Sequence, residues 1–263
     1  MVFEKLSYEQ KNGIGSITLN DPENRNIISG VIVDELEQCL DACAENPDVR
    51  VIVLKGAGKA FSAGGNINRM KERIDAGRYA EYGTGIRKLS RIVVRLRNIR
   101  KPIIAAIHGA AAGGGLNLAL ACDFRIAADD TKFVFAFVNI GLVPDVGGPL
   151  PLVRMVGVAR ATELLMTGRL FTAREASDWG LINEAVPLEE LEEATMKLAA
   201  KLSQGPTLSY GCIKAMINRV AFSGLELELD NEAEYQVLCA GSEDHKEGVN
   251  AFLEKRIPVF KGR

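Results

Sequence analysis

The chain contains 263 residues, 47% of them hydrophobic and 25% charged, and its 32 basic and 34 acidic residues give a net charge of −2. Such a composition is typical of a globular protein that is long enough to bury a core without disulfides or metals. The near balance of charge argues against nucleic acid as the main partner. No stretch of 18 residues is apolar and free of charge, so the sequence predicts no membrane-spanning helix.

The cysteines and histidines give no pattern of a metal site. The five cysteines are odd in number and lack CxxC spacing, and only two histidines, His108 and His245, are present. The sequence starts without a long apolar segment and predicts no secretory signal, so we expect a reduced, cytoplasmic protein without metal. His108 is expected to be packed in the structure, whereas His245 lies in a polar stretch and is expected to be exposed.

Strand-like and helix-like segments alternate along roughly the first 200 residues. Apolar or β-branched runs predict strands at 15–19, 49–54, 102–107, 124–127, 133–137 and 181–186. Helices are expected at 31–44, within 66–100, at 115–121, after a capping box formed by Thr172 and Glu175, and at 188–203. This alternation indicates an α/β protein with parallel βαβ units. From 206 onward the pattern is mainly helical, and we divide the chain into residues 1–200 and 201–263.

Two strands end in glycine-rich loops that lead into helices. Residues 61–66 follow the strand at 49–54, and the triple Gly113-Gly114-Gly115 follows the strand at 102–107. Glycine at a helix start leaves N–H groups open and lets a ligand approach the main chain, and the helix dipole favours a negatively charged oxygen. Two such loops aimed at one point would form an oxyanion hole. Either loop alone is explained at least as well by a tight turn between a strand and a helix.

These loops and their surroundings resemble the crotonase (enoyl-CoA hydratase/isomerase) superfamily. Residues 61–67 resemble its first oxyanion-hole segment and 105–115 its second, and the similarity continues at 121–127, 141–144, 165–168, 176–182 and 252–256. It extends from about residue 3 to 262 in the family's order and spacing. The resemblance implies a crotonase-like spiral of ββα turns over 1–200 and a C-terminal helical region, 201–263, that forms homotrimers or dimers of trimers.

The resemblance also implies which residues would bind an acyl-CoA thioester, with coenzyme A as part of the substrate and no separate cofactor. The N–H groups of Gly65 and Gly114 would bind the thioester oxygen, onto which charge moves when the α-proton leaves. The residues that match the family's CoA contacts are Arg25, Ala63, Ile67, Phe252 and Lys255. The two cations in this set are also consistent with solvated surface charge. The basic stretch 69–73 could help to attract the polyanionic CoA, but as a run of charges it is expected to be a solvated helix face.

The sequence departs from the family pattern at the acid/base residues, which determine the reaction. Family hydratases use two glutamates, and their positions hold Asn117 and Phe137 here. Because the addition of water needs a base and an acid, these replacements argue against the usual hydration mechanism. One carboxylate remains, Asp145, where several single-carboxylate isomerases of the family carry their base. Residues 110–123 and 136–145 are most similar to the 1,2-epoxyphenylacetyl-CoA isomerase branch.

The leading hypothesis is therefore an acyl-CoA isomerase. Asp145, in a largely apolar pocket with Asn117, Phe137 and Val138, would move a proton between two carbons while a double bond shifts, or assist the rearrangement of a ring epoxide. Burial would raise the pKa of Asp145 toward that of a useful base. In the alternative interpretation, Asp145 caps the turn that follows it.

Other functions remain open from the sequence. A hydratase with relocated acid/base groups would hydrate crotonyl-CoA, and a non-catalytic acyl-CoA-binding protein would bind CoA esters without turnover. In an aryl-CoA dehalogenase Asp145 would be the nucleophile, but Ser90 and Phe137 stand where a histidine and a tryptophan would be needed. An unrelated α/β domain would bind no CoA.

Overall fold

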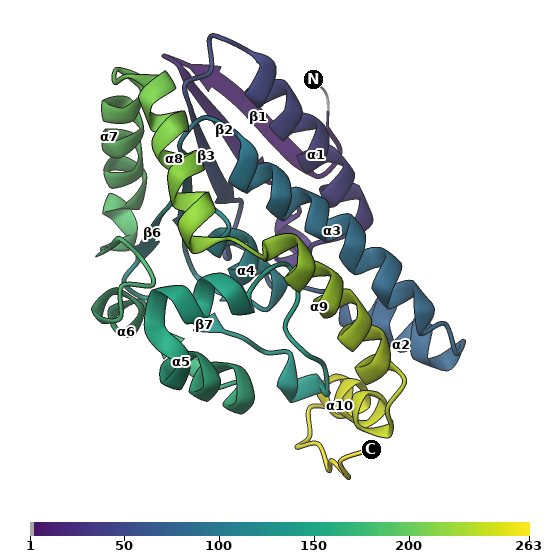
Figure 1. The fold of residues 1–263 in the computed structure, drawn as a ribbon. Helices are drawn as coiled ribbons and strands as arrows, with labels where there is room; N and C mark the ends of the chain where they lie inside the picture. Colours follow the sequence, from purple (N-terminus) through teal and green to yellow (C-terminus); the bar gives the residue numbers. More distant parts are fainter. Residues whose placement is uncertain (1–2) are drawn as a thin grey trace.

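The computed structural model describes residues 3–263 and contains two β-sheets (Figure 1). The larger sheet has the strand order β1-β2-β3-β4-β6-β9, in which β1 is antiparallel to β2 and the other neighbours are parallel. Its strands are β1 (Leu6–Lys11), β2 (Ile14–Leu19), β3 (Val51–Gly56), β4 (Ile103–Ile107), β6 (Phe124–Ala128) and β9 (Glu184–Val186). The smaller sheet consists of β5 (Ala110–Ala112), β7 (Lys132–Val134) and β8 (Leu170–Thr172).

Ten α-helices surround these sheets within residues 3–263. In the first two thirds of the chain they are α1 (Gly30–Glu45), α2 (Ile67–Asp75), α3 (Ala80–Asn98), α4 (Gly114–Leu120), α5 (Pro149–Thr167) and α6 (Ala173–Asp178). They are followed by α7 (Leu191–Ser203), α8 (Thr207–Ala221), α9 (Leu225–Ala240) and α10 (Glu243–Glu254). Short 3₁₀ helices occupy Pro22–Asn24, Val138–Ile140 and Leu188–Glu190. In this part of the chain no helix is long and apolar enough to cross a membrane.

The central strands β3 and β4 of the six-stranded sheet are buried on both faces, as the continuous apolar run at 49–54 predicted for β3. Along β3, Ile52 and Leu54 face the main core, which α1 and α3 cover. Val51 and Val53 point to the opposite face, which is covered by α7. This alternation follows from the period of two along a strand. The sheet is therefore a rigid layer whose strand ends can hold loops in fixed positions.

Most predicted elements are present, and the differences have local causes. The Ser29 hydroxyl caps α1, and the capping box of Thr172 and Glu175 opens α6. The edge strand β1 was not predicted because its side chains are mostly exposed and polar. The helical stretch at 66–100 divides into α2 and α3, with Gly77 at φ +65° between them. The strand expected at 181–186 is shorter, since only 184–186 pair with β6.

The C-terminal helices lie against the rest of the chain. The helix α9 packs along α3, and α10 lies next to α2 and the 3₁₀ helix at 138–140 (Figure 1). One side of α9 is buried, and at helical spacing this side presents Leu225, Leu229, Glu232, Ala233, Gln236 and Ala240. The region that the resemblance assigns to oligomerisation thus also covers the core of its own chain.

Candidate active site

The two glycine-rich loops lie side by side. The Ser62 N–H group donates to the Ala110 carbonyl oxygen (3.2 Å), and the Ala112 N–H group donates to the Ser62 carbonyl oxygen (3.0 Å). At Gly64, where φ is +81°, a Cβ atom would lie 2.5 Å from the Ala112 carbonyl oxygen. Glycine therefore permits both the left-handed backbone and the close contact of the loops. The folding of the chain brings the two predicted segments together.

Gly65 and Gly114 carry the N–H groups that the resemblance assigns to binding the thioester oxygen. Within residues 3–263, neither group donates a hydrogen bond to a protein atom. Gly114 is the first residue of α4, so no earlier residue of that helix can accept its N–H. An oxygen with negative charge is the kind of ligand that free amides at a helix start favour.

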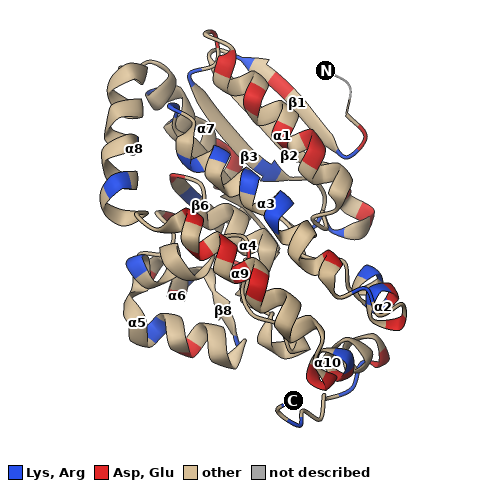
Figure 2. Ribbon diagram, turned by 45° about the vertical axis from the view of Figure 1, so that its right-hand side comes forward, with Lys and Arg blue, Asp and Glu red and all other residues tan. Residues whose placement is uncertain are grey.

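A cavity of about 240 Å³ opens beside these loops, between α1, α2, α3 and the loop at 141–148. Its apolar wall includes Ile28, Val33, Met70, Ile86, Leu89 and Leu142. Its basic residues are Arg69, Arg73 and Lys88, and Figure 2 shows basic residues on both α2 and α3. The side chain of Arg73 stacks on the Tyr82 ring, 5.1 Å from its centroid. The basic stretch at 69–73 therefore contributes to the cavity, whereas a solvated helix face was expected.

Asp145 lines this cavity and is 9% exposed. Its Oδ2 atom accepts a hydrogen bond from Gln236 Nε2 (3.0 Å), while Oδ1 accepts none from the described residues. Oδ1 lies beside the second glycine loop, since a Cβ atom on Gly114 would be 3.6 Å from it. Burial raises the pKa of Asp145 to about 7, and the hydrogen bond from Gln236 opposes this rise.

The alternative in which the Asp145 side chain caps the following turn is wrong. The Gly148 N–H group donates to the main-chain oxygen of Asp145 (3.2 Å), and the carboxylate bonds to Gln236 instead. The next two residues have left-handed backbone, with φ +56° at Val146 and +68° at Gly147. For a buried β-branched residue such as Val146 this conformation is strained, so the surrounding contacts must hold it.

Asn117 supports the Asp145 loop from α4. Its Nδ2 atom donates to the Asp145 carbonyl oxygen (2.6 Å), and its side chain is 1% exposed. A Cβ atom on Gly148 would lie 2.3 Å from Asn117 Nδ2, so glycine at 148 permits this contact. The amide thus fixes the main chain of Asp145.

The other two predicted pocket residues also lie away from the cavity wall. The Phe137 ring packs on the glycine triple, 3.6 Å from where a Cβ of Gly113 would lie, and Val138 begins the 3₁₀ helix at 138–140. Neither residue, nor Asn117, lines the cavity beside Asp145. The expectation that these three residues line this pocket is therefore not met, because the side chains of α1, α2 and α3 form its wall.

The predicted CoA-binding residues fall into two groups. The Ala63 N–H group donates to the Arg25 carbonyl oxygen (2.9 Å), and Ile67 begins α2 just beyond the first glycine loop. These three residues therefore lie near one another at the loops. Phe252 is 60% exposed on α10, and Lys255 follows the end of that helix. No hydrogen bond within residues 3–263 connects this second group to the first.

The sequence interpretation missed two residues of α9 that reach the Asp145 loop. Gln236 and Glu232 are 1% and 3% exposed, and Glu232 Oε2 accepts a hydrogen bond from the Gly147 N–H group (2.9 Å). Burial raises the pKa of Glu232 to about 8, and the nearby Asp145 contributes to the rise. Both residues lie on the buried side of α9, so a polar residue within an apolar helical stripe was the signal that could have identified them.

His245 is fully buried, which corrects the expectation that it is exposed. Its Nδ1 atom lies 2.7 Å from the Ile140 carbonyl oxygen, and its Nε2 atom lies 2.8 Å from the Tyr82 hydroxyl. Because a carbonyl only accepts, Nδ1 carries the hydrogen and Nε2 accepts from Tyr82. Burial lowers the pKa of His245. His108 is half-buried and bonds to the Gly58 carbonyl oxygen (2.9 Å).

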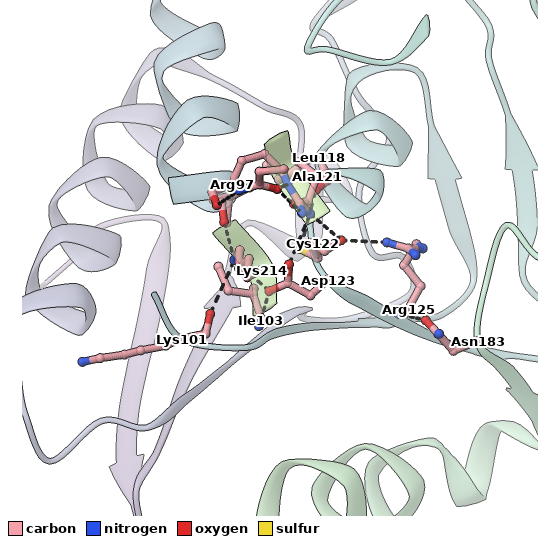
Figure 3. A network of polar contacts seen from close by, with 12 residues as sticks. Arg97, Lys101, Ile103, Leu118, Ala121, Cys122, Asp123, Arg125, Asn183 and Lys214 are labelled. Carbon is pink, nitrogen blue, oxygen red and sulfur yellow. Dashed lines mark hydrogen bonds and ion pairs between the residues drawn. The ribbon is translucent and has the colours of Figure 1, made fainter. Parts of the chain in front are cut away.

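A second polar cluster surrounds Asp123, as Figure 3 shows. Its carboxylate pairs with Lys214 Nζ of α8 (2.7 Å) and with Arg97 of α3 (3.2 Å), and also accepts from the Ile103 N–H group (2.9 Å). The cluster borders a larger cavity of about 430 Å³. Asp123 already has two cationic partners there, so this cavity offers no free carboxylate. No group of three or more His, Cys, Asp or Glu side chains suited to a metal occurs within residues 3–263.

The fold is that of crotonase-type proteins. The structure is similar to that of an enoyl-CoA hydratase from Mycobacterium avium subsp. paratuberculosis, with a TM-score of 0.89, 30% identity and coverage of 99% of this chain and all of that one. The sequence matches the enoyl-CoA hydratase/isomerase family over residues 9–263, and the chain belongs to this family.

Two curated relatives have isomerase names. The chain is 36% identical to trans-2-decenoyl-[acyl-carrier-protein] isomerase of Streptococcus mutans, with both chains covered completely. It is 39% identical to 1,2-epoxyphenylacetyl-CoA isomerase of Escherichia coli, over 98% of each. A relative in Bacillus subtilis, 38% identical over 95% of each, is a probable enoyl-CoA hydratase. The protein is thus an enzyme of the enoyl-CoA hydratase/isomerase type.

Proposed function

We propose that the protein is an acyl-CoA isomerase in which Asp145 transfers the proton and the N–H groups of Gly65 and Gly114 bind the thioester oxygen. One observation carries this proposal. Of the described residues that line the cavity, Asp145 is the single carboxylate, and its unpaired Oδ1 lies beside Gly114. The two positions where family hydratases carry glutamates hold an amide and a phenyl ring here.

The reaction follows from these groups. Asp145 Oδ1 takes a proton from C2 of a 3-enoyl thioester, and the electron pair of the broken C–H bond moves onto the thioester oxygen. The two free N–H groups stabilise that charge, and one such donor contributes about 10²–10³ in rate. The protonated Asp145 then returns the proton to C4, which leaves a 2-enoyl thioester. A base with a pKa of about 7 suits both steps near neutral pH.

A ring epoxide is the second substrate class that we propose. The residues 110–123 and 136–145 support it by their similarity to the epoxide isomerase branch, and the relative from Escherichia coli is named 1,2-epoxyphenylacetyl-CoA isomerase. In this reaction the same carboxyl group would assist the rearrangement of the ring. Turnover of 1,2-epoxyphenylacetyl-CoA faster than that of a straight-chain 3-enoyl-CoA would favour this class.

The proposed isomerase is tested by following the conversion of a 3-enoyl-CoA to the 2-enoyl-CoA with the wild type and with Asp145→Asn. We expect the variant to bind the substrate but to lose the conversion and the exchange of the α-proton with deuterium. Conversion at the wild-type rate in the variant would contradict the role of Asp145. Rapid hydration of crotonyl-CoA would favour the hydratase, and binding without any exchange in the wild type would favour an inactive acyl-CoA-binding protein.

We also propose a cytoplasmic homotrimer or dimer of trimers that needs no cofactor beyond the CoA of its substrate, with CoA contacts from Arg25, Ala63, Ile67, Phe252 and Lys255. Exposed apolar side chains on α8 support the assembly: Leu208, Met216 and Val220 are 84%, 69% and 75% exposed. The covering of such a surface by another copy would remove it from water. Sedimentation of the purified chain as a monomer at micromolar concentration would contradict the assembly.

A further inference from the structure

We propose that Gln236 and Glu232 are positioning residues for Asp145: Gln236 holds Oδ2 and leaves Oδ1 as the proton-transferring oxygen, and Glu232 holds the turn that follows. The proposal rests on the proposed isomerase function and adds to it the residues of α9. Neither side chain was predicted from the family pattern, and both are contributed by the C-terminal region of the same chain.

The Gln236 amide has one possible orientation in this site. Its Nε2 group donates both hydrogens, one to the Val143 carbonyl oxygen (2.8 Å) and one to Asp145 Oδ2 (3.0 Å). Because both partners are acceptors, a flipped amide would place its own oxygen against them. In this orientation the Gln236 Oε1 atom is buried without a partner in the described chain. The carboxylate of Asp145 is thereby held with one oxygen bound and the other free.

Glu232 lies one helical turn before Gln236 and acts on the next part of the same loop. Its Oε2 atom accepts from the Gly147 N–H group, which belongs to the strained turn of Val146 and Gly147. A strained backbone persists only when its surroundings fix it. Loss of this anchor would let Val146 relax toward an ordinary conformation and would move the adjacent Asp145. Glu232 does not line the cavity, so its effect must pass through the loop.

Burial distinguishes Glu232 from the other acidic residues of α9. Figure 2 shows several acidic residues along this helix, and of these Glu226, Asp230 and Glu234 are exposed. Glu234 is two residues from both proposed positions and points to solvent. It therefore provides a matched control on the same helix for each substitution.

The first test compares the pH dependence of kcat/KM for the wild type, Gln236→Met and the control Glu234→Met. Methionine keeps the length of the side chain but cannot donate to Oδ2. We expect the acid limb, near pH 7 in the wild type, to move up by about one to two pH units in Gln236→Met, because a hydrogen bond to a charged group favours the ionised form. The rate at high pH, where Asp145 is ionised in both proteins, should fall severalfold, because Oδ1 is no longer held in place. An acid limb that stays in place would overturn the proposal for Gln236.

A direct titration separates this proposal from the proposed function. The protein labelled with ¹³C at aspartate carboxyl groups is titrated by NMR, and the signal missing in Asp145→Asn is assigned to Asp145. We expect the same upward shift in Gln236→Met as in the rate profile. If the shift occurs but no CoA ester is turned over, Gln236 holds Asp145 and the isomerase function is wrong. An unchanged titration midpoint in Gln236→Met would overturn the positioning role, whatever the activity.

The second test uses Glu232→Gln and Glu232→Leu, with Glu234→Gln as the control. Glutamine keeps an acceptor for the Gly147 N–H group, so kcat near pH 7 should remain within a few-fold of the wild type. Leucine has no acceptor, and we expect kcat to fall about tenfold or more with little change in KM, because a displaced base misses the reacting proton. Equal kcat values for the two variants at 232 would overturn the role of the anchor. Circular dichroism and melting curves identify the fraction that is folded, to which kcat is normalised.

Discussion

Asp123 and Asp145 are two shielded carboxylates that the C-terminal helices contact in different ways. Asp123 meets the ammonium of Lys214 from α8 and the guanidinium of Arg97, and its side chain is 15% exposed. Within residues 3–263, the Asp145 carboxylate accepts its one hydrogen bond from the neutral amide of Gln236 on α9. Both contacts join a residue of the last quarter of the chain to a loop of the core, but the charge is compensated at one site and left uncompensated at the other.

The difference explains how one residue type serves two purposes. The carboxylate of Asp123 pairs with two cations and so fixes the elements that supply them. Without a cation, burial favours the protonated form, and the pKa of Asp145 rises to about 7. Asp145 can therefore take up and release a proton near neutral pH. The uncompensated site is the one that lines the cavity beside the free N–H groups.

The largest effect is expected from Asp145→Asn. Asparagine keeps the shape of the side chain but cannot carry a proton between carbons, so the isomerisation rate should fall by about 10²–10⁴. The free energy of unfolding at pH 8 should stay the same or rise, because no charge remains to be buried. Rate assays and urea denaturation of the same preparation provide the comparison. A large loss of stability with the activity retained per folded molecule would assign Asp145 a structural role.

The opposite result is expected from Asp123→Asn. Removal of this charge leaves Arg97 and Lys214 buried without their carboxylate, since their side chains are 6% and 7% exposed. The free energy of unfolding should fall by about 3–5 kcal/mol, the usual cost of breaking a buried pair. The exposed Asp130, changed to asparagine, is the matched control. If the free energy of unfolding of both variants equals that of the wild type, the cluster does not stabilise the fold.

The uncompensated site also predicts a pH dependence of stability. Asp145 and Glu232 have folded pKa values of about 7 and 8, above their ordinary values of 3.8 and 4.5. At a pH between the ordinary and the folded pKa of each group, the folded chain thus binds more protons than the unfolded chain. The free energy of unfolding should therefore fall, by on the order of a few kcal/mol, as the pH rises from 5 to 9. In the double variant Asp145→Asn and Glu232→Gln, the free energy of unfolding, measured by denaturation at each pH, should depend less on pH. An equally steep fall would contradict the assignment of this pH dependence to Asp145 and Glu232.

The sequence predicted much of the core and the two glycine loops, because each rests on local signals. The apolar run at 49–54 overlaps β3, and Ser29 directly precedes α1, the helix that it caps. The supports of Asp145 were not predicted, because they depend on contacts between distant parts of the chain. Gln236 lies 91 residues from Asp145 along the chain, and His245 lies 163 residues from Tyr82. No local sequence pattern predicts which loop a buried polar side chain on α9 will contact.

The substitution Gln236→Lys would give Asp145 a cationic partner like that of Asp123. In Gln236→Lys an ammonium replaces the amide beside Asp145, as Lys214 stands beside Asp123. An opposite charge at this distance lowers the pKa of a carboxyl group by about 1–3 units, so the acid limb of kcat/KM should move below its wild-type position near pH 7. The carboxylate becomes a weaker base, and the rate on the plateau should fall severalfold. The exposed Glu234→Lys should leave the limb in place. An acid limb that moves up in Gln236→Lys would mean that burial dominates even beside a cation, and that the missing cation is not what distinguishes Asp145 from Asp123.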